Sequence, residues 1–131
     1  MRVTIDTNVL LRATLDDDPV QNDIAASILR EAEAIAVPSA VLCEFVWVMR
    51  GGYKKTNERT VAAIKALLAD PKVVCDRAAA EAGLAMLIAG GDFADGIIAF
   101  EGRRLGGDIF ATFDKKAARL IAETGGRVEL L

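Results

Sequence analysis

Short apolar runs alternate with longer amphipathic segments along the chain. The short runs are rich in valine, isoleucine and threonine, which favour β-strands, and residues that typically cap helices or form turns bound them on both sides. The pattern predicts five strands, at residues 2–6, 34–37, 73–75, 108–113 and 127–131.

The segments between these strands carry helix signals. Asp18 followed by Pro19 is a typical N-cap with proline in the first turn. Ser39 begins a second helix that ends at Gly51-Gly52, and Thr56 or Asn57 begins a third. The predicted helices cover residues 18–34, 39–50, 56–69, 76–89, 93–105 and 114–124.

Alternation of strands and helices with short connections predicts an α/β fold. The strands are apolar without alternation, as expected when both faces of a parallel sheet are covered, so three layers, α/β/α, are expected. The 131 residues contain no internal repeat or linker, which predicts a single domain over residues 1–131.

The residue types that are missing restrict the chemistry. The chain has no histidine, and its two serines, Ser27 and Ser39, lie in no nucleophile motif. No glycine-rich phosphate loop is present. Cys43 and Cys75 fit no metal-ligand spacing and are interpreted as reduced, buried small residues. Carboxylates acting with a metal ion are therefore the main catalytic tools that remain.

The apolar pattern also bears on location. No apolar run approaches the roughly 20 residues that span a bilayer, and Asp6 comes too early for a secretory signal. We therefore expect a cytoplasmic protein with no membrane partner. The net charge of −3 argues mildly against a nucleic-acid partner. Neutralisation of the four site acids proposed below would leave about +1 on the rest of the chain, so net charge alone does not decide the question.

Three acids stand at informative positions. In parallel α/β sheets, ligands bind at the carboxyl ends of strands, where Asp6 and Asp114 lie; each could instead only cap a helix. Glu44 is the single charge in the apolar segment 37–49. A helix that is apolar all round is a buried helix, so Glu44 would need a partner or a metal. The alternative is one exposed stripe that passes through Glu44.

A fourth acid, Asp95, lies in the first turn of the predicted helix 93–105. It could simply complement the helix dipole, with Asp92 as the cap. Asp92 competes for the same role and is interpreted as a cap or a secondary ligand. Gly96 lowers helix propensity by about 1 kcal/mol relative to alanine, which could mark a close approach.

Four carboxylates in one cleft would repel one another. A divalent cation would relieve that repulsion, and oxygen ligands select Mg²⁺ or Mn²⁺ over Zn²⁺. Such a site can activate water against a phosphodiester bond. The sequence therefore indicates a metal-dependent hydrolase.

The same residues resemble a known family. The opening Asp6-Thr7-Asn8 is similar to the first motif of PIN domains, Glu44 to the second acid, Phe93-Ala94-Asp95 to the third motif, and Thr112-Phe113-Asp114 to the last. The match runs from end to end, and the length is similar to that of VapC-type toxins. Gly96 departs from the family pattern, where alanine is commoner.

The resemblance implies a sheet with strand order 3-2-1-4-5 and a metal-dependent endoribonuclease, with Asp6, Glu44, Asp95 and Asp114 as catalytic metal ligands. It implies supporting roles for Asn8 and Thr112, a homodimer, and a small VapB-type antitoxin as partner. A PIN nuclease that processes RNA without being a toxin is the alternative.

Basic residues offer contacts for RNA phosphates. Tyr53 could stack on a base beside them. A solvated helix face is the other interpretation of these charges. The proposed contacts are Arg50, Lys54, Lys55, Lys115 and Lys116, whereas Trp47 and residues 86–88 are interpreted as core.

Other acid-lined α/β proteins were weighed against this hypothesis. A phospho-acceptor signalling domain needs an acidic pair near the first strand, where Asp6 stands alone. An aspartate-nucleophile phosphatase needs an acid where Asn8 stands. A non-catalytic binding module stays open, and retention of all four acids argues against it.

Overall fold

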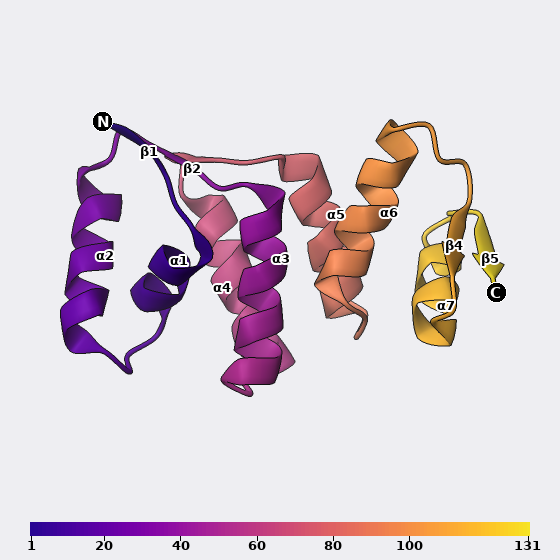
Figure 1. Cartoon of the computed structure of the whole chain (residues 1–131), viewed down its shortest axis with the longest axis horizontal. Helices are drawn as coiled ribbons and strands as arrows, with labels where there is room; N and C mark the ends of the chain where they lie inside the picture. Colours follow the sequence, from indigo (N-terminus) through magenta and orange to yellow (C-terminus); the bar gives the residue numbers. More distant parts are fainter. The chain divides into compact units, whose positions relative to one another are not determined.

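The computed structural model describes all residues from Met1 to Leu131. It comprises two compact units, Met1–Arg77 and Ala78–Leu131 (Figure 1). Each unit contains its own parallel strands and its own helices, and each is described by itself.

The first unit is built on a three-stranded parallel sheet. Its strands are β1 (Arg2–Thr4), β2 (Ala34–Ala36) and β3 (Val73–Val74), in the order β1-β2-β3. Ile35 on the central strand is paired with Val3 on one side and Val73 on the other. It is almost completely buried, as expected for a central strand covered on both faces.

Helices α1 (Thr7–Thr14), α2 (Pro19–Glu31), α3 (Ser39–Trp47) and α4 (Asn57–Ala69) complete this unit, with a π-helical turn, η1 (Val48–Gly52), directly after α3. Helices α2 and α4 each begin with a side-chain N-cap. Asp18 accepts a hydrogen bond from the Gln21 amide, and Thr56 accepts one from the Arg59 amide. Both caps agree with the predictions made from the sequence.

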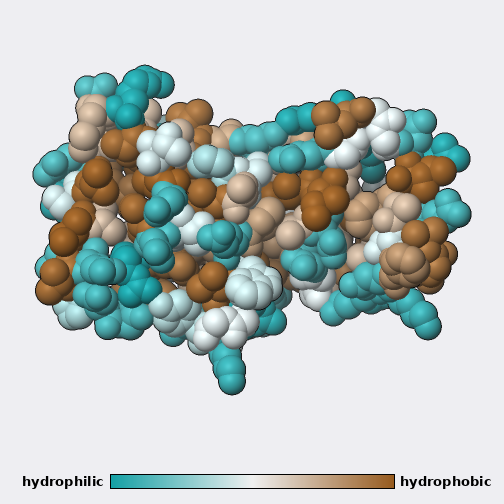
Figure 2. All heavy atoms as spheres, in the orientation of Figure 1, coloured by the Kyte–Doolittle hydropathy of each residue, from teal (hydrophilic) through white to brown (hydrophobic).

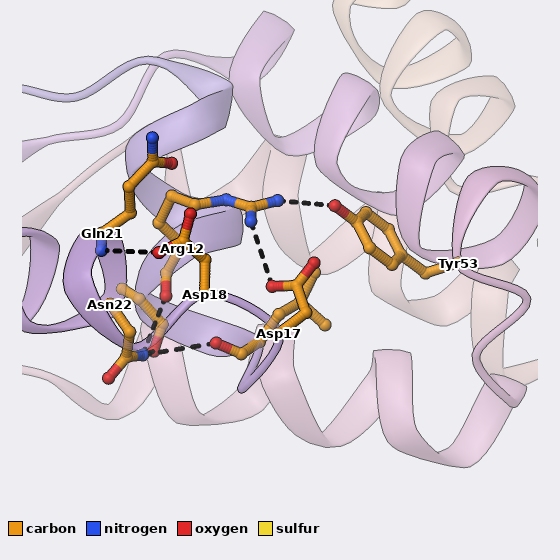
Figure 3. A network of polar contacts seen from close by, with 8 residues as sticks. Arg12, Asp17, Asp18, Gln21, Asn22 and Tyr53 are labelled. Atoms are coloured by element: carbon orange, nitrogen blue, oxygen red, sulfur yellow. Dashed lines mark hydrogen bonds and ion pairs between the residues drawn. The ribbon is translucent and has the colours of Figure 1, made fainter.

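Asn22 ties α2 to the end of α1. Its side-chain amide nitrogen lies 2.8 Å from the Arg12 carbonyl oxygen, 3.5 Å from that of Ala13 and 3.4 Å from that of Leu15. The last carbonyl groups of a helix lack partners within the helix, so this one side chain supplies the missing donor and fixes how α1 meets α2 (Figure 3).

Removal of this side chain is therefore expected to destabilise the fold. Asn22→Ala should lower the free energy of unfolding by about 1–3 kcal/mol, because half-buried carbonyl groups lose their donor. Urea denaturation measures this difference. Gln21→Ala is the control, since the exposed Gln21 side chain makes no hydrogen bond, and an equal loss in both variants would contradict the role given to Asn22.

The second unit contains α5 (Arg77–Ile88), which begins at the last residue of the first unit, and α6 (Phe93–Arg104). Strands β4 (Phe110–Thr112) and β5 (Val128–Leu130) pair in parallel, and α7 (Lys115–Glu123) connects them. Met86, Leu120 and Ile121 are buried together at the centre of this unit. A strand, helix and parallel strand in succession form the βαβ unit expected of an α/β protein.

The predicted strands are all present, and every strand pair is parallel. The neighbours β1-β2-β3 and β4-β5 agree with those parts of the expected order that each unit contains. One continuous sheet of order 3-2-1-4-5, and a single domain over the whole chain, stay predictions. Helix α1 was not predicted. None of the helices is long and apolar enough to cross a membrane.

Three predictions about α3 and its end were wrong. Ser39 does not cap the helix: Pro38 holds the cap position and makes no side-chain hydrogen bond. Trp47 is not core, since 73% of its surface is exposed. The glycine pair at its end also does not stop the helix but lies within the π-helical turn η1.

Apolar side chains also lie at the surface of α2. Val20, Ile24 and Ile28 are 70%, 64% and 37% exposed. Their spacing of four residues places them on one face of the helix, and Figure 2 shows the apolar surface over α2. A stripe of this kind is typical of a surface that meets another macromolecule.

Candidate active site

An open hollow of about 480 Å³ lies in the first unit, between the start of α1 and one face of α3. Two of the predicted catalytic acids line it, with the predicted supporting residue Asn8 and the aromatic ring of Tyr53. The lining residues are Asp6, Thr7, Asn8, Leu11, Ala40, Val41, Glu44, Val48 and Tyr53.

Asp6 follows β1 and is the N-cap of α1. One carboxylate oxygen, Oδ1, accepts a hydrogen bond from the Val9 amide at 3.0 Å. The side chain is otherwise exposed to the hollow. A carboxylate has two oxygens and several lone pairs, so capping α1 leaves Oδ2 available to a cation. The capping and metal-binding interpretations of Asp6 are therefore compatible.

Glu44 lies on the exposed stripe of α3. Leu42 and Phe45 on the same helix are almost fully buried, whereas Ala40, Glu44 and Trp47 are exposed. The expectation of a buried Glu44 was wrong, because the helix turns one stripe outward even though nearly every residue in it is apolar. The Glu44 side chain takes part in no ion pair or hydrogen bond. No arginine neutralises this carboxylate, which lines the hollow with Asp6.

A second, smaller hollow of about 210 Å³ lies in the second unit, at the start of α6 and α7. It contains the other two predicted catalytic acids, Asp95 and Asp114, together with Asp92 and the predicted phosphate contact Lys116. The remaining lining residues are Gly90, Gly91 and Ala117.

Asp114 follows β4 and caps α7. Its Oδ1 accepts hydrogen bonds from the amides of Lys116 and Ala117 at 2.9 and 3.0 Å. The Thr112 hydroxyl oxygen in turn accepts a hydrogen bond from the Asp114 amide at 3.0 Å. Thr112 therefore fixes the turn that presents Asp114. As with Asp6, the cap uses one oxygen of the carboxylate and leaves the other available.

Asp92 caps α6, as predicted, by accepting a hydrogen bond from the Ala94 amide at 2.9 Å. Asp95 lies one turn further on and is half-buried. Burial raises the pKa of Asp95, and the negative charges of Asp92 and Asp114 raise it further. Asp92 and Asp114 are thus close enough to disfavour the ionised form of Asp95, a cost that a bound cation would remove.

The donor set fits a hard divalent cation, because every candidate ligand is a carboxylate oxygen and like charges face the same hollow. The structure brings no three acidic or cysteine side chains into a group that could hold a metal ion. Asp6 and Glu44 line the hollow of the first unit, and Asp95 and Asp114 line the hollow of the second.

The basic residues that were predicted to contact RNA differ in their exposure and their hydrogen bonds. The Arg50 guanidinium donates to the Lys55 carbonyl at 2.7 Å and so holds the turn after η1 together. Lys54 is exposed and Lys55 is half-buried beside it. Lys115 is exposed at the start of α7, next to Lys116. Contacts between these residues and RNA stay predictions.

A polar network beside the first hollow was missed by the sequence reasoning. One Arg12 nitrogen donates to the Tyr53 hydroxyl at 2.5 Å, and the other donates to Asp17 at 3.0 Å (Figure 3). The contact with Tyr53, and then the charge of Asp17, raise the pKa of Arg12. Arg12 and Tyr53 are 41 residues apart, so no local pattern could have signalled this pair.

The PIN domain family model matches residues 3–122, nearly the whole chain. The chain therefore belongs to the PIN domain family. Members of this family are generally metal-dependent nucleases, which is consistent with a site made of carboxylates and no histidine. No curated protein matches the chain in sequence.

Proposed function

We propose that this protein is an endoribonuclease that hydrolyses RNA phosphodiester bonds with Mg²⁺ or Mn²⁺, and that it is the toxin of a VapBC-type toxin–antitoxin pair acting in the cytoplasm. The observation that carries the proposal is the placement of the acids. Asp6 and Asp114 each lie two residues after the end of a parallel strand, and each lines a hollow with a second candidate ligand.

The edge strands of the two sheets bear on the proposed strand order. β1 is the last strand of its sheet, and β4 is paired with β5 alone. An edge strand has backbone amide and carbonyl groups that can pair with a further strand. We propose that β1 and β4 pair, giving the order 3-2-1-4-5. Asp6 and Asp114 would then follow adjacent strands at the same edge of one sheet, as ligand-binding residues do in this fold class.

Each residue has a definite task in this site. Asp6, Glu44, Asp95 and Asp114 would hold the cation, and the caps of α1 and α7 keep two of these carboxylates in fixed positions. Asn8 offers a side-chain amide to water or phosphate in the first hollow. When bound, the cation lowers the pKa of a coordinated water and offsets the charge of the phosphate.

Cleavage should depend on the metal. RNA cleavage is expected with millimolar Mg²⁺ or Mn²⁺ and should stop when EDTA is added, since the chain has no histidine to serve as a general base in place of the metal. Water should attack the phosphorus, so the fragments should carry 5′-phosphate and 3′-hydroxyl ends. End-group analysis of a labelled oligonucleotide measures this. Fragments with 2′,3′-cyclic phosphate that form in EDTA would contradict the proposal.

The third ligand can be tested at the start of α6. Asp95→Asn should abolish cleavage and leave metal-free stability level or higher, because it removes a charge that Asp92 and Asp114 disfavour. Asp92→Asn should change activity little, since asparagine caps a helix as well as aspartate. Activity assays and thermal melts compare the two variants. An inactive Asp92→Asn beside an active Asp95→Asn would reverse the assignment.

The toxin role is supported by two surfaces. A carboxylate-lined hollow is a natural target for an arginine, which can bridge two carboxylates, and we propose that an arm of a small VapB-type antitoxin supplies it. The exposed apolar stripe of α2 could be covered by that antitoxin or by the second copy in a homodimer.

Expression of the chain alone in its native host should therefore arrest growth, and co-expression of a short reading frame of ~70–90 codons from the adjacent upstream position should relieve the arrest. A copy with Glu44→Gln is the control and should be harmless. If the active protein is harmless alone and purifies with no small partner, the chain is a PIN nuclease of RNA processing and not a toxin.

A further inference from the structure

Tyr53 is the aromatic residue of the first hollow. It lines this space with Asp6, Asn8 and Glu44, and 36% of its surface is exposed. Its hydroxyl is engaged by Arg12. The ring of Tyr53, and not its hydroxyl, is therefore the group that remains available for a ligand in the hollow.

The backbone around Tyr53 is held in an unusual conformation. Tyr53 ends the π-helical turn η1, and its amide donates to the Val48 carbonyl at 2.9 Å. Lys54 has a φ of +54°, which is uncommon for a residue other than glycine. The Lys55 amide donates to the Met49 carbonyl at 2.8 Å. Short π-helical turns and left-handed residues recur at functional sites.

Arg12 fixes the far end of the same side chain. Only 17% of the Arg12 side chain is exposed, and its second nitrogen is paired with Asp17. The backbone carbonyl of Arg12 is itself held by Asn22 at 2.8 Å (Figure 3). The tyrosine is thus anchored at its backbone by η1 and at its hydroxyl by α1, so little freedom is lost when its ring meets a ligand.

The negative charge of the first hollow bears on the role of the Tyr53 ring. Asp6 and Glu44 repel a phosphate, and the chain as a whole carries a net charge of −3. Contacts that involve no charge would therefore add affinity for RNA next to these acids. Stacking of a base on an aromatic ring is such a contact, and it is open only to an unpaired base.

We propose that Tyr53 is the stacking platform for one unpaired nucleobase of the RNA substrate, and that Arg12 and Asp17 are positioning residues that hold the ring. This inference rests on the proposed ribonuclease function. It makes the substrate a single-stranded segment and assigns one nucleotide next to the cleaved bond to the hollow of Asp6 and Glu44.

The test uses an RNA oligonucleotide that the wild-type protein cleaves at one mapped bond, and a set of copies in which one base at a time near that bond is missing. In Tyr53→Leu the KM for the complete oligonucleotide should rise about 5- to 150-fold with little change in kcat, the range expected for one stacked base. Tyr53→Phe, which retains the ring but loses the contact with Arg12, should give a KM between those of the wild type and Tyr53→Leu.

The missing base gives a double-mutant cycle. At one position, loss of the base should raise the KM of the wild type as much as Tyr53→Leu does, and the two changes together should cost no more than either alone. Trp47→Leu is the matched control, since Trp47 is an exposed aromatic residue outside the hollow, and it should leave KM unchanged.

A spectroscopic measurement does not depend on the folding of Tyr53→Leu. The chain has one tyrosine and one tryptophan, so Tyr53 is the main fluorophore of Trp47→Phe. Its emission should be quenched by the complete oligonucleotide and much less by the copy that lacks the stacked base.

The stacking role would be overturned if the KM increases caused by Tyr53→Leu and by a missing base multiplied at every position. It would also be overturned if every copy of the oligonucleotide quenched the Tyr53 emission equally. Metal-dependent cleavage by the wild type would still stand in both cases. A wild-type protein that cleaves no RNA with Mg²⁺ or Mn²⁺ would overturn the proposed function and this inference together.

Discussion

Glu44→Gln is expected to abolish RNA cleavage without harming the fold. Glutamine has nearly the same volume but lacks the charge needed to hold a cation, so we expect activity to fall by on the order of 10²-fold or more. Stabilisation by added Mg²⁺ should fall with it, since a ligand stabilises only to the extent that it binds the folded state.

The surroundings of Glu44 determine the metal-free stability expected for this variant. Glu44 is exposed and has no ion pair, so its replacement strands no buried partner charge. The metal-free melting temperature should stay level or rise slightly, because the hollow that Glu44 shares with Asp6 loses one of two like charges. Thermal melts with and without Mg²⁺, run beside the cleavage assay, measure both effects.

Glu81→Gln is the matched control. Glu81 is an exposed glutamate on α5, outside both hollows, and its replacement should change neither activity nor the response to Mg²⁺. A Glu44→Gln protein that is much less stable without metal, yet still cleaves RNA, would show that Glu44 is structural.

Gly96→Ala is expected to destabilise the protein although alanine is the better helix former. A Cβ atom at Gly96 would lie 2.5 Å from the Ala82 carbonyl oxygen and 2.8 Å from the Gly83 Cα, both in the backbone of α5. Backbone atoms of a packed helix cannot move aside cheaply, and overpacking of this kind costs about 1–3 kcal/mol. That exceeds the gain in helix propensity of about 1 kcal/mol.

Gly102→Ala provides a control in the same helix. A Cβ atom at Gly102 would meet nothing within 4 Å, so this variant should gain up to about 1 kcal/mol from propensity alone. The two substitutions should therefore shift the midpoint of urea denaturation in opposite directions. A stabilised Gly96→Ala protein would mean that α5 and α6 are not packed as closely as described.

The same contact explains one departure from the family pattern. The PIN resemblance favours alanine at position 96, and the sequence indicated only that something approaches closely there. The structure identifies the neighbour as the backbone of α5. Because Asp95 is the adjacent residue, the close contact of α6 with α5 also fixes where this carboxylate lies in its hollow.

Features set by local chemistry could be predicted from the sequence. Asp18 with Pro19, Thr56 and Asp114 each cap a helix through a hydrogen bond to an amide two or three residues away. Such signals lie within a few residues of one another, so they can be recognised without knowing the rest of the fold. The strands were found for the same reason, as short β-branched runs between these caps.

Features set by distant contacts could not be predicted. Helix α1 has only eight residues, too few to show a clear helical period, and its cap Asp6 was interpreted first as the end of a strand. The outward stripe of α3 was missed because an apolar composition does not say which face a helix buries. The four acids were named from the sequence and their catalytic role stays a prediction, whereas the anchoring of Tyr53 by Arg12 depends on the fold.

Asp6 and Asp114 each cap a helix, and their proposed second use as metal ligands has a practical consequence for trapping a complex with RNA. Alanine at either position would remove a ligand and also unwind the first turn of a helix, so an inactive alanine protein would differ from the native one in shape. Asparagine accepts the same capping hydrogen bond but carries no charge. A form with asparagine at both positions is therefore the better choice for crystallising bound, uncleaved substrate.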